Sequence, residues 1–180
     1  MTIRETGIEG LFHLIPIFFE DERGYFFESY NKQVFNDLGI KENFVQDNLS
    51  KSQKGVLRGL HFQNPPHAQG KLVSVIYGAV LDIAVDIRKN SITYGKYYAA
   101  ELSENNKHIL WIPPGFAHGF LTLEDNTIFS YKCTGLYNKS AEDSILWNDP
   151  DLNINWGIVS PKLSKKDQNA QRFKGFHSKF

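Results

Sequence analysis

The chain has 180 residues and carries 20 Lys and Arg against 20 Asp and Glu, so its formal net charge is zero. This length predicts one domain over residues 1–180, and a neutral chain has no overall field to attract nucleic acid or an anionic membrane. A single cysteine, Cys133, excludes an internal disulfide framework, and with no basic-then-apolar leader and no apolar run of about 20 residues we expect a cytoplasmic location.

Short strands are predicted along most of the chain. In residues 80–87 apolar side chains alternate with Asp82 and Asp86, a pattern typical of a half-buried strand. Similar runs lie at 25–30, 72–77, 96–102, 108–112, 118–123 and 127–133, with polar or glycine-containing turns between them. Strands at this spacing predict an antiparallel sandwich or barrel.

Two short helices are predicted. Asn31 is placed to cap the first, whose apolar residues Val34, Phe35 and Leu38 share one side before Gly39 ends it. The second begins at Ser164, three residues before Asp167. We expect the end of the basic segment 162–180 to be loosely packed.

Residues 58–71 hold the densest group of reactive side chains, including Arg58, His61 and Lys71. If 57–62 is a strand, its period of two sends Arg58 and His61 to opposite faces, so they need a bulge or a twist to converge. The plainer interpretation is an ordinary half-buried histidine at His61 and a solvated amine at Lys71.

Residues 111–120 contain a Pro-x-Gly-x-x-His motif at Pro113, Gly115 and His118, which is the second sequence motif of the cupin barrels. The first cupin motif would supply His-x-His and a later Glu, but this chain has His61-Phe62-Gln63 at that place. Three protein ligands are the usual minimum for a catalytic metal, so the sequence predicts a barrel without a metal. A metal-dependent cupin is the alternative.

Several collinear segments resemble the dTDP-4-dehydrorhamnose 3,5-epimerases and together cover almost the whole chain. They are residues 19–30, 44–48, 56–62, 68–71, 111–120, 131–132, 143–149 and 163–167. The resemblance implies a cupin-type double-stranded β-helix, or jelly roll, with short peripheral helices. It also implies a homodimer in the cytoplasm that acts on a dTDP-4-keto-6-deoxyhexose for dTDP-L-rhamnose biosynthesis.

The resemblance also implies catalytic roles. His61 is the base, Asp167 orients it, Tyr131 is the acid, and Lys71 supplies positive charge at the enolate oxygen. These roles suit the reaction, because a 4-keto group acidifies C3 and C5, and inversion requires a base on one face and an acid on the other. Neither a cofactor nor a metal is required.

Eight further positions match binding residues of the family. The expected substrate contacts are Arg23, Phe26, Glu28, Gln46, Asn48, Arg58, His118 and Tyr137. The arginines suit a diphosphate, whereas Phe26 and Glu28 match positions at the thymidine end. In the family the segment 23–28 enters the site of the neighbouring subunit.

Three alternatives remain at the level of the sequence. The first is an epimerase that inverts one centre only, at C3 or C5, as some related cupins do. It stays open because residues 135–139 differ from the aromatic-rich form common in the family. A 3,4-ketoisomerase is a second alternative in the same class. A non-catalytic cupin that binds nucleotide sugars is the third, although it predicts loss of His61, Asp167 or Tyr131, and all three are present.

Overall fold

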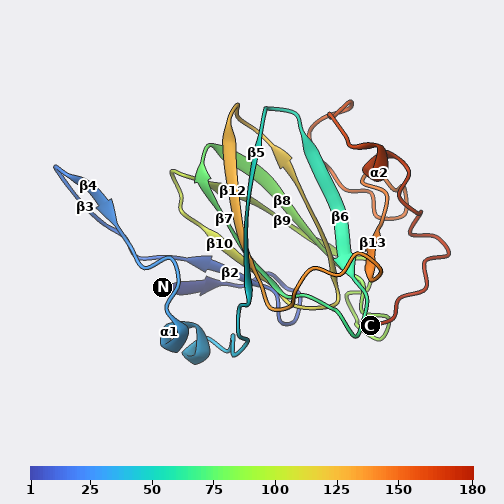
Figure 1. Ribbon diagram of the computed structural model, residues 1–180, viewed down its shortest axis with the longest axis horizontal. Coiled ribbons are helices and arrows are strands. Elements are labelled where there is room, and N and C mark those ends of the chain that lie inside the picture. The colour runs from blue at the N-terminus through green and yellow to red at the C-terminus, as the bar shows by residue number, and fades with distance from the viewer.

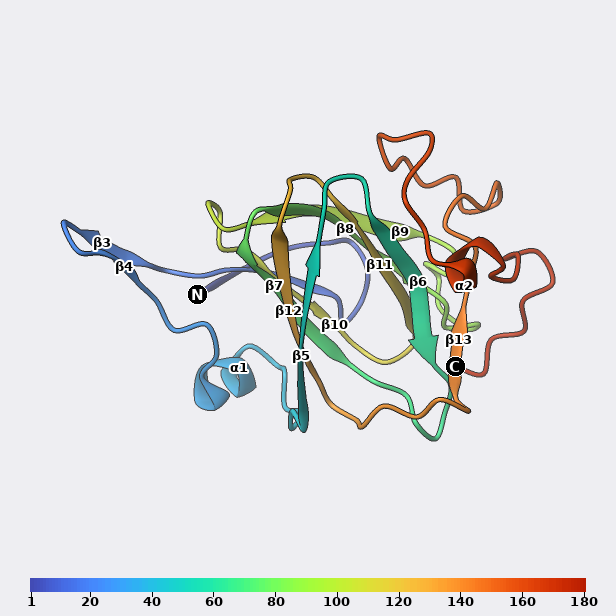
Figure 2. The same cartoon turned by 45° about the horizontal axis from the view of Figure 1, so that its top comes forward.

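The computed structural model describes residues 1–180, which fold mainly into two β-sheets that face each other (Figure 1 and Figure 2). The six-stranded sheet has the order β1 (Thr2–Arg4), β2 (Phe12–Ile15), β10 (Ile109–Ile112), β7 (Lys71–Tyr77), β12 (Thr127–Cys133) and β5 (Gln46–Ser52). The five-stranded sheet has the order β13 (Glu142–Ser144), β6 (Leu57–Gln63), β11 (Phe116–Thr122), β8 (Ala79–Asp86) and β9 (Tyr97–Ser103). Neighbouring strands are antiparallel throughout, which confirms the predicted all-β jelly roll.

One apolar core lies between the two sheets and a second lies behind the five-stranded sheet. The inner core joins Val73 and Phe129 of the six-stranded sheet to Val80 and Phe120 of the five-stranded sheet. The outer core joins strands β6, β8 and β11 to side chains from the C-terminal third of the chain, such as Trp156. Both faces of the five-stranded sheet are therefore covered.

Strand β8 corrects the expectation of a half-buried strand. Its Val80 and Ala84 belong to the inner core and its Ile83 and Val85 to the outer core, and the polar residue Asp82 is fully buried. A buried carboxylate is tolerated only with partners, and Asp82 has one in His118 on the adjacent strand. The alternation is present, but the face that carries Asp82 is turned to the inner core between the sheets and not to bulk water.

The predicted strand over residues 25–30 is wrong beyond Phe26. Strands β3 (Phe19–Asp21) and β4 (Gly24–Phe26) pair only with each other and form a hairpin that projects away from the sheets (Figure 1 and Figure 2). Past the hairpin no strand is available as a partner, and Tyr30 packs instead on Phe35 and Phe44. The hairpin leaves large apolar side chains exposed, with Phe19 and Phe26 each 69% accessible.

Both predicted helices are present and short. Helix α1 (Lys32–Asp37) begins after Asn31, whose side chain accepts from the backbone N–H groups of Gln33 and Val34. Helix α2 (Lys165–Gln168) begins after Ser164, whose Oγ accepts from the backbone N–H of Asp167 at 3.1 Å. Neither helix has the length and apolar character of a membrane-spanning segment.

The expectation of a loosely packed C-terminal end is wrong. Phe173, Phe176 and Phe180 pack against the outer core, and the rings of Phe176 and Phe180 lie 5.5 and 6.4 Å from that of Phe62. The last carbonyl, that of Phe180, also accepts from the backbone N–H of Lys89. Composition alone did not predict these contacts, because the phenylalanines are spaced among lysines and other polar residues.

Candidate active site

Two adjoining hollows lie between the sheets and share His61, Lys71 and Tyr131 in their walls. The smaller has a volume of about 140 Å³ and the larger of about 300 Å³. The smaller is also lined by Ser50, Arg58, His118, Phe120 and Phe129. The larger is also lined by Gln46, Asn48, Phe62, Gln63, Gln69, Cys133, Tyr137 and Glu142. Nine of the twelve residues expected from the sequence therefore converge on one region, with Asp167 directly behind His61.

A β-bulge in β6 lets Arg58 and His61 line the same hollow. On the neighbouring strand β11, His118 is opposite His61 and Phe120 is opposite Arg58, so three steps along β6 match two steps along β11. One extra residue in a strand turns the following side chain to the other face. The bulge required by the sequence argument is therefore present.

Glycines allow the close approach of backbones at this bulge. A Cβ at Gly59, where φ is +139°, would lie 2.4 Å from the Cα of Gly119. A Cβ at Gly119 would in turn lie 2.8 Å from the carbonyl oxygen of Arg58. Any larger residue at either position would push β6 from β11 and move His61.

His61 is partly exposed and pairs with the buried carboxylate of Asp167. The Nε2 of His61 lies 2.5 Å from Oδ1 of Asp167, whose side chain is 4% exposed. Burial alone would raise the pKa of Asp167, but the hydrogen bond and charge of His61 outweigh it and hold that pKa below its usual range. An ionised carboxylate can only accept, so Nε2 carries a proton, and in the neutral form of the ring the lone pair of Nδ1 is free to take another.

Tyr131 and Lys71 enter from the opposite sheet. Strands β12 and β7, which carry them, are neighbours in the six-stranded sheet, whereas His61 is on the five-stranded sheet. Burial raises the pKa of the Tyr131 phenol, so the hydroxyl keeps its proton at neutral pH. Burial lowers the pKa of the Lys71 ammonium, and the nearby Cys133 and Asp82 oppose part of that shift.

His118 is a buried histidine in the wall of the smaller hollow. Its Nε2 lies 2.9 and 3.0 Å from the two carboxylate oxygens of Asp82. Burial lowers the pKa of His118 although the carboxylate of Asp82 acts in the opposite direction. A neutral imidazole fixed in this way can present one nitrogen to a polar ligand.

Polar side chains surround the mouth of the larger hollow. The side chain of Gln46 donates to Oδ1 of Asn48 at 3.0 Å and accepts from the backbone N–H of Tyr137 at 3.0 Å. Tyr137 is exposed, and its hydroxyl donates to Oε2 of Glu142 at 3.0 Å. Arg58 is also exposed and holds only a weak bond of 3.3 Å to Ser52, so its guanidinium has donors left for an anion.

Sequence reasoning missed two charged residues of the site. Glu142 lines the larger hollow and lies 2.6 Å from the ammonium of Lys166 on α2. Glu142 is on a three-residue strand with no periodic pattern of its own, so no local signal marked it. Lys166 could have been suspected, because it directly precedes Asp167 in residues 163–167, one of the segments that resemble the family.

At the second histidine position of the first cupin motif this chain has Gln63, which binds two backbone groups. Gln63, which stands where a second histidine would bind metal, donates to the carbonyl of His67 at 2.7 Å and accepts from the backbone N–H of Asn138 at 2.7 Å. Its amide therefore fixes two loops beside the hollow. No three His, Cys, Asp or Glu side chains gather into a group that could hold a metal ion.

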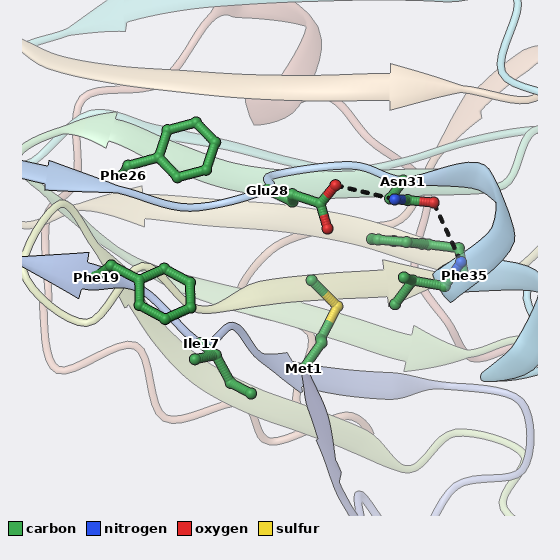
Figure 3. A pocket seen from close by; sticks show the side chains of 8 residues that line it. Met1, Ile17, Phe19, Phe26, Glu28, Asn31 and Phe35 are labelled. Carbon is green, nitrogen blue, oxygen red and sulfur yellow. Dashed lines mark hydrogen bonds between the residues drawn. The ribbon is translucent and has the colours of Figure 1, made fainter.

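Arg23, Phe26 and Glu28 are not brought to this site within one chain. Arg23 is at the tip of the projecting hairpin and pairs with Asp21 at 2.5 Å. Phe26 and Glu28 line a separate apolar hollow of about 220 Å³ between the hairpin and α1 (Figure 3), where Glu28 accepts from Asn31 at 2.9 Å. Three of the twelve expected residues thus lie in residues 19–28, called the arm here, which extend from the body of the molecule.

Comparisons with known proteins agree on one family. The family model described as dTDP-4-dehydrorhamnose 3,5-epimerase matches residues 5–175. A relative of that name from Shigella flexneri is 52% identical over 174 residues, which are 96% of each chain.

Solved structures agree with this match. The crystal structure of dTDP-4-dehydrorhamnose 3,5-epimerase from Elizabethkingia anophelis is 52% identical, with a TM-score of 0.93 over 97% of both chains. A structure of the epimerase from Legionella pneumophila in complex with dTDP-4-keto-L-rhamnose is 47% identical, with a TM-score of 0.92 over 96% of this chain and 93% of that one.

Proposed function

Because this chain belongs to the dTDP-4-dehydrorhamnose 3,5-epimerase family, we propose that the two hollows between its sheets are the active site of that reaction. The enzyme inverts C3 and C5 of dTDP-4-dehydro-6-deoxy-D-glucose and gives dTDP-4-dehydro-L-rhamnose, in the biosynthesis of dTDP-L-rhamnose. It works in the cytoplasm, a location that its single cysteine suits.

The reaction is a sequence of proton transfers. Nδ1 of His61 takes the proton from the carbon next to the ketone, and the carbanion delocalises onto the ketone oxygen as an enolate. Asp167 stabilises the imidazolium that forms, and Lys71 supplies positive charge at the enolate oxygen, where one such donor lowers the barrier by about 3–4 kcal/mol in a dry site. Tyr131 then delivers a proton to the opposite face. His61 then gives its proton to water and Tyr131 takes one from water, and the same steps at the second carbon complete the product, with neither cofactor nor metal.

The observation that carries this proposal is the placement of His61 and Tyr131 on opposing sheets around one shared hollow. A base and an acid on the same wall would return the proton to the face from which it came. Opposite walls are what inversion requires.

The remaining cavity residues bind the substrate. Arg58 contacts the diphosphate, Gln46 and Asn48 contact the sugar or phosphate, His118 donates or accepts near the ketone, and Tyr137 stacks at the mouth. The support for these roles is that all five line the hollows that hold His61.

A second copy of the chain supplies Arg23, Phe26 and Glu28. This part of the proposal is supported by the projecting hairpin, whose apolar side chains are exposed on a single chain. Large exposed apolar groups on an extended arm are typical of a surface that another protein covers. Each site of the homodimer is then completed by its partner's arm.

Mixed dimers test this arrangement. Arg23→Ala and His61→Ala are each expected to be nearly inactive at low substrate concentration. Mixed and refolded together, they should recover about a quarter of wild-type activity, because half of the dimers are mixed and each mixed dimer of a two-fold assembly has one intact site. Recovery of no activity would mean that each chain uses its own arm.

Deuterium incorporation tests the reaction itself. The purified protein is incubated with dTDP-4-keto-6-deoxyglucose in deuterium oxide, and NMR locates the deuterium. We expect it at both C3 and C5, with and without a chelator. Deuterium at one carbon alone would mean a single-centre epimerase, and deuterium at neither carbon, with dTDP bound, would mean a nucleotide-sugar-binding protein. Loss of activity with the chelator would mean a metal-dependent enzyme.

A further inference from the structure

Asp167 is carried by a segment that has little structure of its own. Helix α2 has only four residues, and helices this short are not stable alone because nucleation is costly. The place of Asp167 opposite His61 is therefore set by the contacts that hold the chain on either side of α2. Residues 162–180, called the C-terminal strap here, make these contacts along the outer side of the five-stranded sheet (Figure 2).

The upstream end of the strap is fixed by the backbone. The carbonyl of Lys162 accepts from the backbone N–H of Leu57 at 3.0 Å, and its N–H donates to the carbonyl of Gly55 at 2.7 Å. This bridge holds the strap to the start of β6, the strand that carries His61.

The downstream end is fixed by a buried carboxylate. Oδ2 of Asp149 accepts from the backbone N–H of Phe173 at 2.9 Å, and Oδ1 accepts from that of Asp151 at 2.9 Å. The side chain of Asp149 is 1% exposed. Gln171 adds a second tie, because its carbonyl accepts from the backbone N–H of Leu146 at 2.8 Å. The strap is thus held five residues before Asp167 and again four and six residues after it.

We infer that Asp149 is a positioning residue for the proposed epimerase reaction, acting through Asp167. Both oxygens of its carboxylate accept from backbone N–H groups, one of which belongs to the strap, and Asp149 itself does not line the hollows. An amide in its place has one acceptor oxygen and turns an NH2 group, which can only donate, toward the other N–H, so either the Phe173 or the Asp151 N–H loses its partner. A buried N–H without a partner is unfavourable enough to displace the chain that carries it, and the displacement reaches Asp167 through six residues.

The inference rests on the proposed function, and a double-mutant cycle tests the link between the two aspartates. For Asp149→Asn we expect kcat to fall about 10-fold, the lower end of the loss seen when a residue that orients a metal ligand is removed, with KM for the substrate nearly unchanged. In the Asp167→Asn background the same substitution should have little further effect on kcat, because residues that act through one another are not additive. An equal loss in both backgrounds, or no loss in either, would overturn the inference.

One control and a second variant of the strap separate positioning from general destabilisation. Leu14→Ala opens the small core on the six-stranded sheet, far from the strap, and should lower the melting temperature while kcat stays near wild type. Phe173→Ala keeps the buried carboxylate and removes the ring that lies 5.1 Å from that of Tyr94. It should lower kcat as Asp149→Asn does in the wild-type background, and it should cause little further loss in the Asp167→Asn background. It is the variant to use if Asp149→Asn does not fold.

A measurement without turnover distinguishes failure of this inference from failure of the proposed function. Nitrogen NMR of the His61 ring reports which nitrogen carries the proton. We expect Nε2–H in the wild type and a mixture of tautomers in Asp149→Asn. An unchanged ring spectrum would overturn the inference even in an active enzyme, whereas the absence of deuterium incorporation by the wild type would overturn the proposed function alone.

Discussion

His61→Ala is expected to lower the rate of exchange at both C3 and C5 by roughly 10³- to 10⁴-fold, near the upper end of what one acid–base group contributes. Both carbons lose their proton to the same nitrogen in the proposed mechanism, so the two rates should fall together. The measurement is the rate of deuterium incorporation at each carbon in deuterium oxide. Calorimetric titration with dTDP should give an affinity near that of the wild type, because the expected diphosphate contacts come from other residues.

His67→Ala is the matched control for this experiment. His67 follows His61 by six residues, and its side chain is exposed and does not line the hollows. It is expected to leave both exchange rates unchanged. If His61→Ala kept exchange at one carbon while losing it at the other, a second base would act at the surviving carbon.

The sequence predicts those parts of the fold that depend on local patterns. The capping side chains of Asn31 and Ser164 satisfy backbone N–H groups within three residues, so both helix starts could be found from the sequence. Strand 127–133 was predicted with its true bounds, because its aromatic and β-branched residues suit a pleated surface.

Features that depend on distant partners could not be predicted from such patterns. Asp82 was expected to face water because nothing near it in sequence shows that His118, 36 residues away, completes a buried pair. The pairing of His61 with Asp167 spans 106 residues and came from the resemblance alone. The same holds for the strap, whose Phe176 and Phe180 pack on Phe62, which lies 114 and 118 residues earlier in the chain.

The candidate site was predicted more completely than the fold around it. Resemblance named nine residues that gather at the two hollows, and the sequence argument expected a bulge or a twist between Arg58 and His61, of which the structure has the bulge. It did not name Glu142, which accepts a hydrogen bond from Tyr137 and pairs with Lys166 at the mouth of the hollow. Residues that support other residues carry no motif, so geometry is needed to find them.

Tyr131→Phe is expected to separate proton loss from inversion. The ring can keep its place, since it packs beside Phe129 with the centroids 6.0 Å apart, and only the hydroxyl is lost. Burial raises the pKa of this phenol, so the wild type offers a protonated donor at neutral pH. Without the donor, His61 can still remove a proton, exchange it with solvent and return a deuteron to the same face. Formation of the inverted product should fall by about 10² or more, while deuterium still enters the recovered substrate.

NMR of the recovered substrate and of the product in deuterium oxide measures both rates in one sample. Tyr77→Phe is the control, because Tyr77 is half exposed at the end of β7 and outside the hollows, and it should change neither rate. If Tyr131→Phe inverted the sugar at the wild-type rate, the proton would come from another donor. If it lost exchange and inversion equally, the hydroxyl would act when the enolate forms and not when it is reprotonated. Exchange with retention is the outcome that requires a base and an acid on opposite walls, which is the arrangement proposed for His61 and Tyr131.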